Sequence, residues 1–381
     1  MKKWIALLLA LVLLTSSLPY AKGAEPDIPA PSAILIDAAT GTVLYEKNAH
    51  QRLAPASVTK VMTLLLIMEA LDNNRISWDD RVTASPEAAA KGGSQIYLEP
   101  GEQLSMDEMI KSVVVSSAND CATALAEHVA GSEAAFVDRM NARAADLGLQ
   151  DTHFVNCTGL DDHPNAAEHL TSAYDLAMIS RELLRHDRIR NYTTIWTDTV
   201  RDGKFGLSNT NKLVRFYEGT TGLKTGYTSA AGHCLAASAL REGMELIAVV
   251  LHCNSSVDRF ESAKTLLNHG FANYALVTVE PPEVLRPLQV SLGEQDLVTP
   301  ILRETSPILV DKADLPTITK AVELTEAPEA PVTRGQVLGS MTISAGDRIL
   351  ARIPIEASTT VNRLTLWQMT LRLLKKMCMA G

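Results

Sequence analysis

The stretch PASVTKVMTLLLIMEAL, residues 55–71, decides how the rest of the chain is interpreted. Val61–Leu71 is apolar on nearly every face of a helix and contains neither Gly nor Pro, which indicates a buried helix. Ser57 and Lys60 stand three residues apart on one face of its first turn. A serine becomes a good nucleophile when a base removes its proton, and a lysine with a lowered pKa can be that base. The stretch suggests a Ser–Lys pair, although S-x-x-K alone is common by chance.

Two further motifs follow along the chain. Ser117-Ala118-Asn119 comes after the apolar segment Val113–Val115 and offers a hydroxyl that could relay a proton and an amide that could bind a peptide group. The alternative is an ordinary helix cap. Lys224-Thr225-Gly226 lies on a strand pattern, where the lysine could bind a carboxylate and the glycine lets a ligand backbone approach. The alternative is an exposed edge-strand lysine. The order S-x-x-K, S-x-N, K-T-G is far more specific than any one motif.

The arrangement of strand and helix patterns predicts an α+β fold. Strands at both ends of this part of the chain enclose a helical zone, which favours one antiparallel sheet packed against helices. The expected strands are Ala33–Ile36, Val43–Tyr45, Leu223–Thr228, Cys234–Leu240 and Leu246–His252; the helical zone is Ser57–Arg185, with loops at Lys91–Ser94 and Cys157–Asn165; a closing helix is Glu261–Tyr274.

The composition changes near Pro281-Pro282. Short β-branched runs spaced by Gly, Asp and Pro then predict a small all-β domain. In the last residues of the chain, the apolar side chains recur with the period of a helix. We therefore expect a signal peptide at 1–24, a catalytic domain at 25–275, a β-rich domain at 276–360 and a C-terminal amphipathic helix at 361–381.

The first 24 residues have the layout of a secretory signal peptide. Lys2 and Lys3 precede the apolar run Trp4–Leu14, and the small residues Gly23 and Ala24 suit a cleavage site. The run is short for a membrane span, although an uncleaved anchor is the alternative. We expect an exported protein.

Composition excludes several other functions. The net charge of −9 argues against a nucleic-acid partner. The five cysteines are odd in number and form no C-x-x-C pair, so neither a disulfide framework nor a zinc site is expected. We also expect no cofactor and no other metal. A single bridge between Cys234 and Cys253, on neighbouring predicted strands, stays open.

The motifs around Ser57, Ser117 and Lys224 together resemble the serine D-alanyl-D-alanine carboxypeptidases, which are low-molecular-mass penicillin-binding proteins. The resemblance covers nearly the whole chain. It implies removal of the terminal D-alanine from peptidoglycan stem peptides through a serine acyl-enzyme, and covalent inhibition by β-lactams.

The resemblance also implies a role for each site residue. Some relatives carry His where this chain has Tyr227, so the role of the Tyr227 side chain stays open. The expected roles are Ser57 as nucleophile, Lys60 as its base, Ser117 and Lys224 as proton donors to the leaving amine, Asn119 as a partner of the substrate amide, Thr225 and Gly226 as the strand beside the substrate, and the backbone N–H groups of Ser57 and Tyr227 as the oxyanion hole.

Two outlying residues complete the expected site. His169 resembles a family histidine on the active-site rim, with a solvent-loop histidine as the alternative. Arg259 resembles an arginine that relatives use for the substrate carboxylate, because a buried carboxylate needs a cationic partner. Its alternative is a surface ion pair with Asp258 or Glu261.

The tail predicts a helix in the membrane interface. Leu364–Met379 places Leu and Trp side chains on a broad side and Gln368, Arg372, Lys375 and Lys376 on a narrow one. The alternative is a helix docked on the β-rich domain. With the signal peptide, the tail places the protein at the outer face of the cytoplasmic membrane.

Two other functions compete with this hypothesis. A class A β-lactamase uses a glutamate-activated water, but no E-x-x-L-N stretch follows Ser117-Ala118-Asn119 at a useful distance. A non-catalytic wall-binding module would have lost at least one catalytic residue, and all are present.

Overall fold

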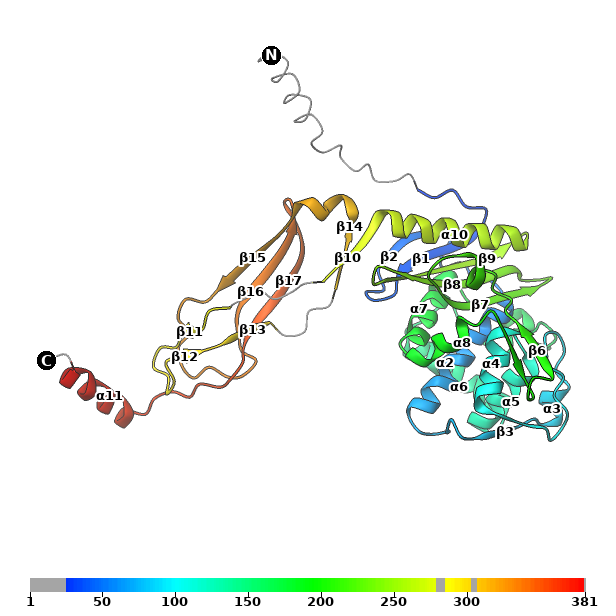
Figure 1. The fold of residues 1–381 in the computed structure, drawn as a ribbon, viewed down its shortest axis with the longest axis horizontal. Coiled ribbons are helices and arrows are strands. Elements are labelled where there is room, and N and C mark those ends of the chain that lie inside the picture. The colour runs from blue at the N-terminus through cyan, green and yellow to red at the C-terminus, as the bar shows by residue number, and fades with distance from the viewer. Residues whose placement is uncertain (1–24, 279–284, 303–306, 380–381) are drawn as a thin grey trace, which may run out of the picture. The chain divides into compact units, whose positions relative to one another are not determined.

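The computed structural model describes residues 25–278, 285–302 and 307–379 (Figure 1). These residues fall into two compact units, the N-terminal unit up to residue 272 and the C-terminal unit from residue 273. Each unit is described by itself. Both contain antiparallel sheets, and the first combines its sheet with helices, so the predicted α+β fold is confirmed.

The N-terminal unit is built on one five-stranded antiparallel sheet in the order β2-β1-β9-β8-β7. Its strands come from the two ends of the unit, as the sequence predicted, and β7 forms an edge. The strands are β1 (Ser32–Asp37), β2 (Val43–Lys47), β7 (Thr220–Thr228), β8 (Gly232–Arg241) and β9 (Met244–Cys253).

Helix α10 (Ser256–Asn273) lies against one face of this sheet, where it contacts β1 and β9. A Cβ added to Gly270 would lie 2.4 Å from Leu246 Cδ1 and 3.0 Å from Leu35 Cδ2, so a larger residue there would have to displace these two side chains. The helix begins five residues before the predicted Glu261, and Arg259 therefore lies inside its first turn.

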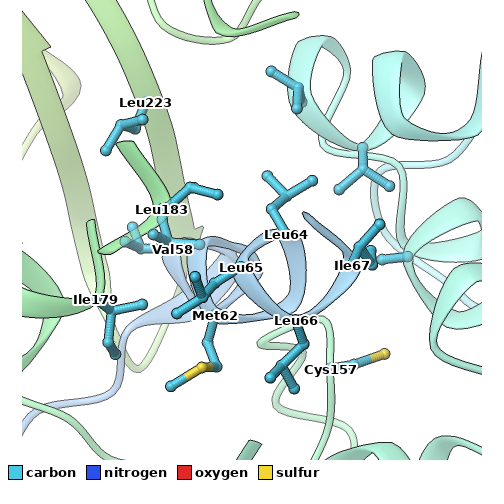
Figure 2. Packing of buried hydrophobic residues seen from close by; sticks show 14 of the residues in the cluster. Val58, Met62, Leu64, Leu65, Leu66, Ile67, Cys157, Ile179, Leu183 and Leu223 are labelled. Carbon is cyan, nitrogen blue, oxygen red and sulfur yellow. The ribbon is translucent and has the colours of Figure 1, made fainter. Parts of the chain in front are cut away.

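Helix α2 (Lys60–Asp72) forms the centre of the core. Its side chains are buried from Lys60 to Met68. Figure 2 shows them beside Ile179 and Leu183 of α7 (Ala173–Leu184) and Leu223 of β7. Truncating one such buried leucine to alanine typically costs about 2–5 kcal/mol of stability. The buried-helix prediction for Val61–Leu71 is thus confirmed, and this packing fixes the position of the preceding turn.

The remaining elements of the N-terminal unit surround α2. Two short antiparallel strand pairs, β3 with β4 and β5 with β6, were missed, because strands of three or four residues leave no readable period. These elements are η1 (Ala56–Thr59), β3 (Arg81–Thr83), α3 (Pro86–Ala89), β4 (Gln103–Ser105), α4 (Met106–Val115), α5 (Asn119–Ala130), α6 (Glu133–Asp146), η2 (Ala166–Glu168), η3 (Asp187–Ile189), α8 (Arg190–Thr193), β5 (Thr197–Val200), β6 (Phe205–Ser208) and α9 (Leu213–Phe216).

The C-terminal unit is mainly β-structure and ends in a helix. Its largest sheet has the antiparallel order β13-β17-β16-β15, and two-stranded pairs join β10 to β14 and β11 to β12. Within the residues described, no helix is long and apolar enough to span a bilayer. The elements are β10 (Tyr274–Val277), β11 (Leu288–Gln289), β12 (Leu297–Val298), β13 (Pro300–Leu302), β14 (Ile308–Asp311), η4 (Lys312–Thr317), β15 (Ile318–Leu324), β16 (Val337–Ala345), β17 (Arg348–Ala357) and α11 (Leu366–Met379).

Candidate active site

Ser57 lies in the 3₁₀ turn η1, which leads directly into α2. The expected α-helical first turn is replaced by this tighter one, stabilised by a bond from Thr59 Oγ1 to the Ala56 carbonyl oxygen of 2.8 Å. Ala56 has φ of 49°, a left-handed conformation that a non-glycine residue adopts at some energetic cost. The turn still places Ser57 Oγ 3.0 Å from Lys60 Nζ, so the predicted pair forms.

Lys60 is fully buried among hydrogen-bond acceptors. Besides Ser57, its Nζ contacts Asn119 Oδ1 at 2.5 Å and the Thr158 carbonyl oxygen at 2.7 Å. Burial lowers the pKa of Lys60 to about 7, although the neighbouring Cys157 and Asp120 act in the opposite direction. A substantial fraction of the Lys60 amine is therefore neutral near neutral pH, as a general base requires.

The S-x-N motif forms the turn between α4 and α5. Ser117 has φ of 63°, and Asn119 is the first residue of α5. The cap position falls on Ala118, which offers no side-chain bond, so the helix-cap alternative is wrong. Asn119 Nδ2 donates to the Gly92 carbonyl oxygen at 2.7 Å, and this bond turns Oδ1 toward Lys60. The carboxamide expected to hold substrate is here a partner of Lys60.

The K-T-G motif lies on β7, but Lys224 is buried and is not an exposed edge lysine. Its Nζ donates to the Thr225 carbonyl oxygen at 2.9 Å. Burial, followed by the charges of Lys60 and Arg259, lowers the pKa of Lys224 well below its usual value. A Cβ on Gly226 would lie 3.0 Å from Ser57 N, so glycine lets β7 approach the nucleophile turn. Lys224 is thus a second buried lysine on the strand that lies against the nucleophile turn.

The segment 209–211 links the S-x-N turn to β7. Thr225 Oγ1 donates to Thr210 Oγ1 at 2.7 Å, and Thr210 N donates to the Val115 carbonyl oxygen at 3.2 Å. Asn211 Nδ2 donates to the Gly222 carbonyl oxygen at 3.0 Å. Sequence reasoning missed these residues because polar loop residues carry no periodic signal.

Asn156–Gly159 forms a second support that the sequence analysis missed. Asn156 Oδ1 accepts bonds from Thr158 N at 3.1 Å and Gly159 N at 2.7 Å. Gly159 has φ of 79°, and a Cβ there would lie 1.8 Å from the Ala56 carbonyl oxygen. The turn thereby holds the Thr158 carbonyl oxygen against Lys60. An Asn followed three residues later by Gly is a turn signal that could have located it.

His169 is buried behind the nucleophile turn, so the solvent-loop alternative is wrong. Val155 N donates to its Nδ1 at 3.1 Å, which leaves Nε2 to donate to Thr59 Oγ1 at 2.7 Å. Burial lowers the pKa of His169 to about 4, so the ring is neutral at physiological pH. Its observed contacts support the turn that carries Ser57.

Arg259 is buried beside β7 and contacts Gly226 and Cys234 through their carbonyl oxygens, at 3.0 and 3.4 Å from Nη1. The alternative, a surface ion pair with Asp258 or Glu261, is wrong, because Arg259 is buried and its Nη1 donates to backbone carbonyl oxygens. Across the described residues Arg259 Nε has no hydrogen-bond partner. Burial lowers the pKa of Arg259.

Two further predictions concern Tyr227 and the cysteines. The Tyr227 ring is 57% exposed and stacks on His233 with centroids 4.4 Å apart, which leaves the role of its side chain unassigned. All five cysteines are free thiols, so Cys234 and Cys253 form no bridge in this structure. No group of three metal-ligating side chains occurs among the residues described.

Comparisons with known proteins agree with this geometry. The family model for D-alanyl-D-alanine carboxypeptidase matches residues 20–255, and that for the penicillin-binding protein 5 C-terminal domain matches residues 280–363. D-alanyl-D-alanine carboxypeptidase DacF of Bacillus subtilis is 38% identical over 375 residues, which cover 95% of each chain.

Solved structures agree as well. Penicillin-binding protein 5 from Haemophilus influenzae has a TM-score of 0.77 at 30% identity, covering 90% of this chain and 100% of that one. Penicillin-binding protein D2 from Listeria monocytogenes, in its ampicillin-bound form, has a TM-score of 0.58 at 31% identity, covering 64% and 98%. With its three motifs gathered around Lys60, this chain belongs to the serine D-alanyl-D-alanine carboxypeptidases, penicillin-binding hydrolases that act on cell-wall peptides.

Proposed function

We propose that Ser57 is the acylated nucleophile and Lys60 its general base. The main support for this assignment is the set of hydrogen-bond partners around Lys60 Nζ. Asn119 Oδ1 and the Thr158 carbonyl oxygen can only accept hydrogen bonds. They take the two N–H groups of the neutral amine, so its lone pair is left facing Ser57 Oγ at 3.0 Å. The amine is thus oriented to remove the Ser57 proton.

The remaining steps follow from this geometry. Ser57 Oγ bonds to the carbonyl carbon between the two D-alanines, and the backbone N–H groups of Ser57 and Tyr227 stabilise the oxyanion. Gly226 supports that role, because it lets β7 lie against Ser57 N. The carbon–nitrogen bond then breaks, and the D-alanine amine receives a proton through Ser117 and Lys224. A water molecule hydrolyses the ester and frees Ser57.

Recognition of the terminal carboxylate is assigned to Lys224, Thr225 and Arg259. Lys224 and Arg259 are both buried, and the charge of Arg259 helps burial to lower the pKa of Lys224. Arg259 Nε also lacks a partner in the described structure. An incoming carboxylate would compensate both charges, which explains a preference for peptides with a free C-terminus.

The same nucleophile is expected to react with β-lactams, since the Listeria relative is described in ampicillin-bound and cefotaxime-bound forms. Fluorescent penicillin and D-alanine release test this assignment on the purified protein. Ser57→Ala should lose both signals, whereas the exposed Ser208→Ala should keep them. Labelling of the Ser57→Ala variant would refute the nucleophile.

Export and membrane attachment complete the proposal. The signal-like segment lies outside the described residues, so its support is the sequence alone. In α11, Gln368 and Arg372 donate to Glu294 and Asp296 of the C-terminal unit at 3.0 and 2.8 Å. The exposed apolar side chains include Leu366, Trp367, Leu373 and Met377, at 63–83% exposure. An apolar face left in water favours a membrane surface as its partner.

A further inference from the structure

Strand β7 contains one residue more than its partner β8 supplies. Thr220 lies opposite Ala239, and Gly222 lies opposite Ser238, the next residue of β8, so Thr221 is an insertion in the ladder. From residue 222 to residue 228 the two strands pair regularly, through the whole K-T-G motif. An insertion of this kind is a β-bulge, and bulges beside active sites commonly redirect a side chain.

The bulge determines which face of the sheet Lys224 uses. Successive side chains of a strand point to opposite faces, so a shift of one residue turns every later side chain to the other face. The start of β7 is fixed, because Thr220 Oγ1 donates to the Tyr217 carbonyl oxygen at 2.7 Å and Leu240 N donates to the Gly219 carbonyl oxygen at 2.8 Å. With this start fixed, a regular strand would turn Lys224 away from Ser57 and Lys60.

Side chains from outside the β7–β8 ladder hold the backbone of the bulge. The Thr221 carbonyl oxygen accepts a hydrogen bond from Thr193 Oγ1 of α8 at 2.5 Å. The Gly222 carbonyl oxygen accepts one from Asn211 Nδ2 at 3.0 Å. A Cβ on Gly222 would lie 3.0 Å from Thr193 Cβ, so α8 lies directly against the bulge. The carbonyl groups displaced by the insertion thus have hydrogen-bond partners.

An ion pair holds the Thr221 side chain. Its Oγ1 lies 2.7 Å from Glu245 Oε1 of β9 and 2.8 Å from Ser238 Oγ of β8. Glu245 Oε2 lies 2.5 Å from Arg190 Nη2 of α8, and both side chains are mostly buried, at 12% and 27% exposure. A carboxylate accepts hydrogen bonds and a hydroxyl has one proton, so the Thr221 proton points to Glu245. Bonds to charged groups are stronger than neutral ones, which makes this a firm anchor.

We propose that Thr221, anchored by Glu245 and Arg190, is a positioning residue for Lys224. The proposal rests on the proposed function, in which Lys224 meets the terminal carboxylate and passes a proton to the leaving amine. A displacement of about 1 Å in a group that positions substrate can cost about 100-fold in rate. The bulge therefore acts on catalysis through Lys224, at a distance from the reacting atoms.

Three variants test the proposal on peptides that end in a free or an amidated D-alanine. Thr221→Val keeps the branched shape and removes the hydroxyl. It should lower kcat/KM for the free-acid peptide about 10- to 100-fold and reduce the preference for it over the amide, as Lys224→Ala does. Thr221→Ser keeps the hydroxyl and should stay within about 3-fold of the unaltered enzyme. Thermal unfolding of each variant checks that the fold is retained.

A double-mutant cycle separates positioning from a general structural effect. If Thr221 acts through Lys224, adding Thr221→Val to Lys224→Ala should cost less than about 2-fold more. A full additional loss in the double variant, or an equal loss on both peptides with Thr221→Val alone, would overturn the proposal. If Lys224→Ala keeps the preference for the free acid, the assigned role of Lys224 is wrong and the proposal falls with it. If Lys224→Ala loses that preference and Thr221→Val keeps it, only the role of the bulge is wrong.

Discussion

The two units differ in what they bury. In the N-terminal unit, the buried residues include Lys60, Asn119, Lys224 and Arg259, whose hydrogen bonds run to one another, to Ser57 or to carbonyl oxygens. In the described part of the C-terminal unit, every fully buried residue is apolar. Burying a polar or charged group costs free energy unless it finds a partner. The N-terminal unit bears that cost around the proposed active site, whereas the described core of the C-terminal unit is apolar.

Because the two units differ in this way, we expect catalysis and membrane binding to be separable. Substitution of Lys60 should have the largest effect. Lys60→Ala should reduce D-alanine release by on the order of 10³-fold or more, because the base and nucleophile act as a unit. Binding to anionic lipid vesicles should be unchanged. Release assays and vesicle flotation on one preparation measure both effects.

The pH profile of the unaltered enzyme sharpens this test. Lys60 acts as a base only when neutral, and its pKa is lowered to about 7. The rate should therefore fall as pH drops below about 7, where the amine gains a proton. A rate independent of pH between 5 and 9 would exclude Lys60 as the base.

Arg259 should give the next largest effect. Arg259→Ala should reduce kcat/KM for peptides with a free terminal carboxylate by about 10- to 1000-fold, the range for losing a charged hydrogen bond. Peptides with an amidated C-terminus should lose far less. Lys264→Ala, at a surface-paired cation on the same helix, is the control. An equal loss on both peptides would mean that Arg259 only maintains the fold.

His169 should have a smaller effect, since it positions Thr59 and touches no reacting atom. His169→Ala should lower kcat about 10-fold and stability by about 1–3 kcal/mol, because Val155 N loses its acceptor and Thr59 Oγ1 loses the donor that His169 provides. The Gln side chain can both accept and donate a hydrogen bond, so His169→Gln should restore both kcat and stability. Thermal unfolding and turnover check this, and a shifted pH profile in His169→Gln would argue for a direct role in proton transfer.

The sequence predicted the parts of the site that depend on local spacing. Ser57 and Lys60 meet because three residues separate them before a buried helix, and the strands around Lys224 follow from their apolar runs. The contacts of Thr158 and Thr210 and the hydrogen bond between His169 and Thr59 could not be predicted from the sequence, because each joins segments that are distant along the chain. The 3₁₀ form of the nucleophile turn also depends on long-range packing, through Gly159 and Gly226.

The C-terminal helix should have the smallest effect on catalysis and the clearest effect on location. Deleting residues 363–381 removes an apolar face that is exposed at Leu366, Trp367 and Met377. Turnover of a soluble peptide should stay within about twofold, because the assigned catalytic residues all lie in the N-terminal unit. Flotation with vesicles should be lost.

A matched variant, Trp367→Ser with Leu373→Ser, keeps the chain length and Arg372 but removes apolar area. It should also weaken vesicle binding. If that variant floats like the unaltered protein while Arg372→Ala does not, charge attraction holds the helix at the surface. If both variants and the deletion still float, the membrane contact lies elsewhere in the chain.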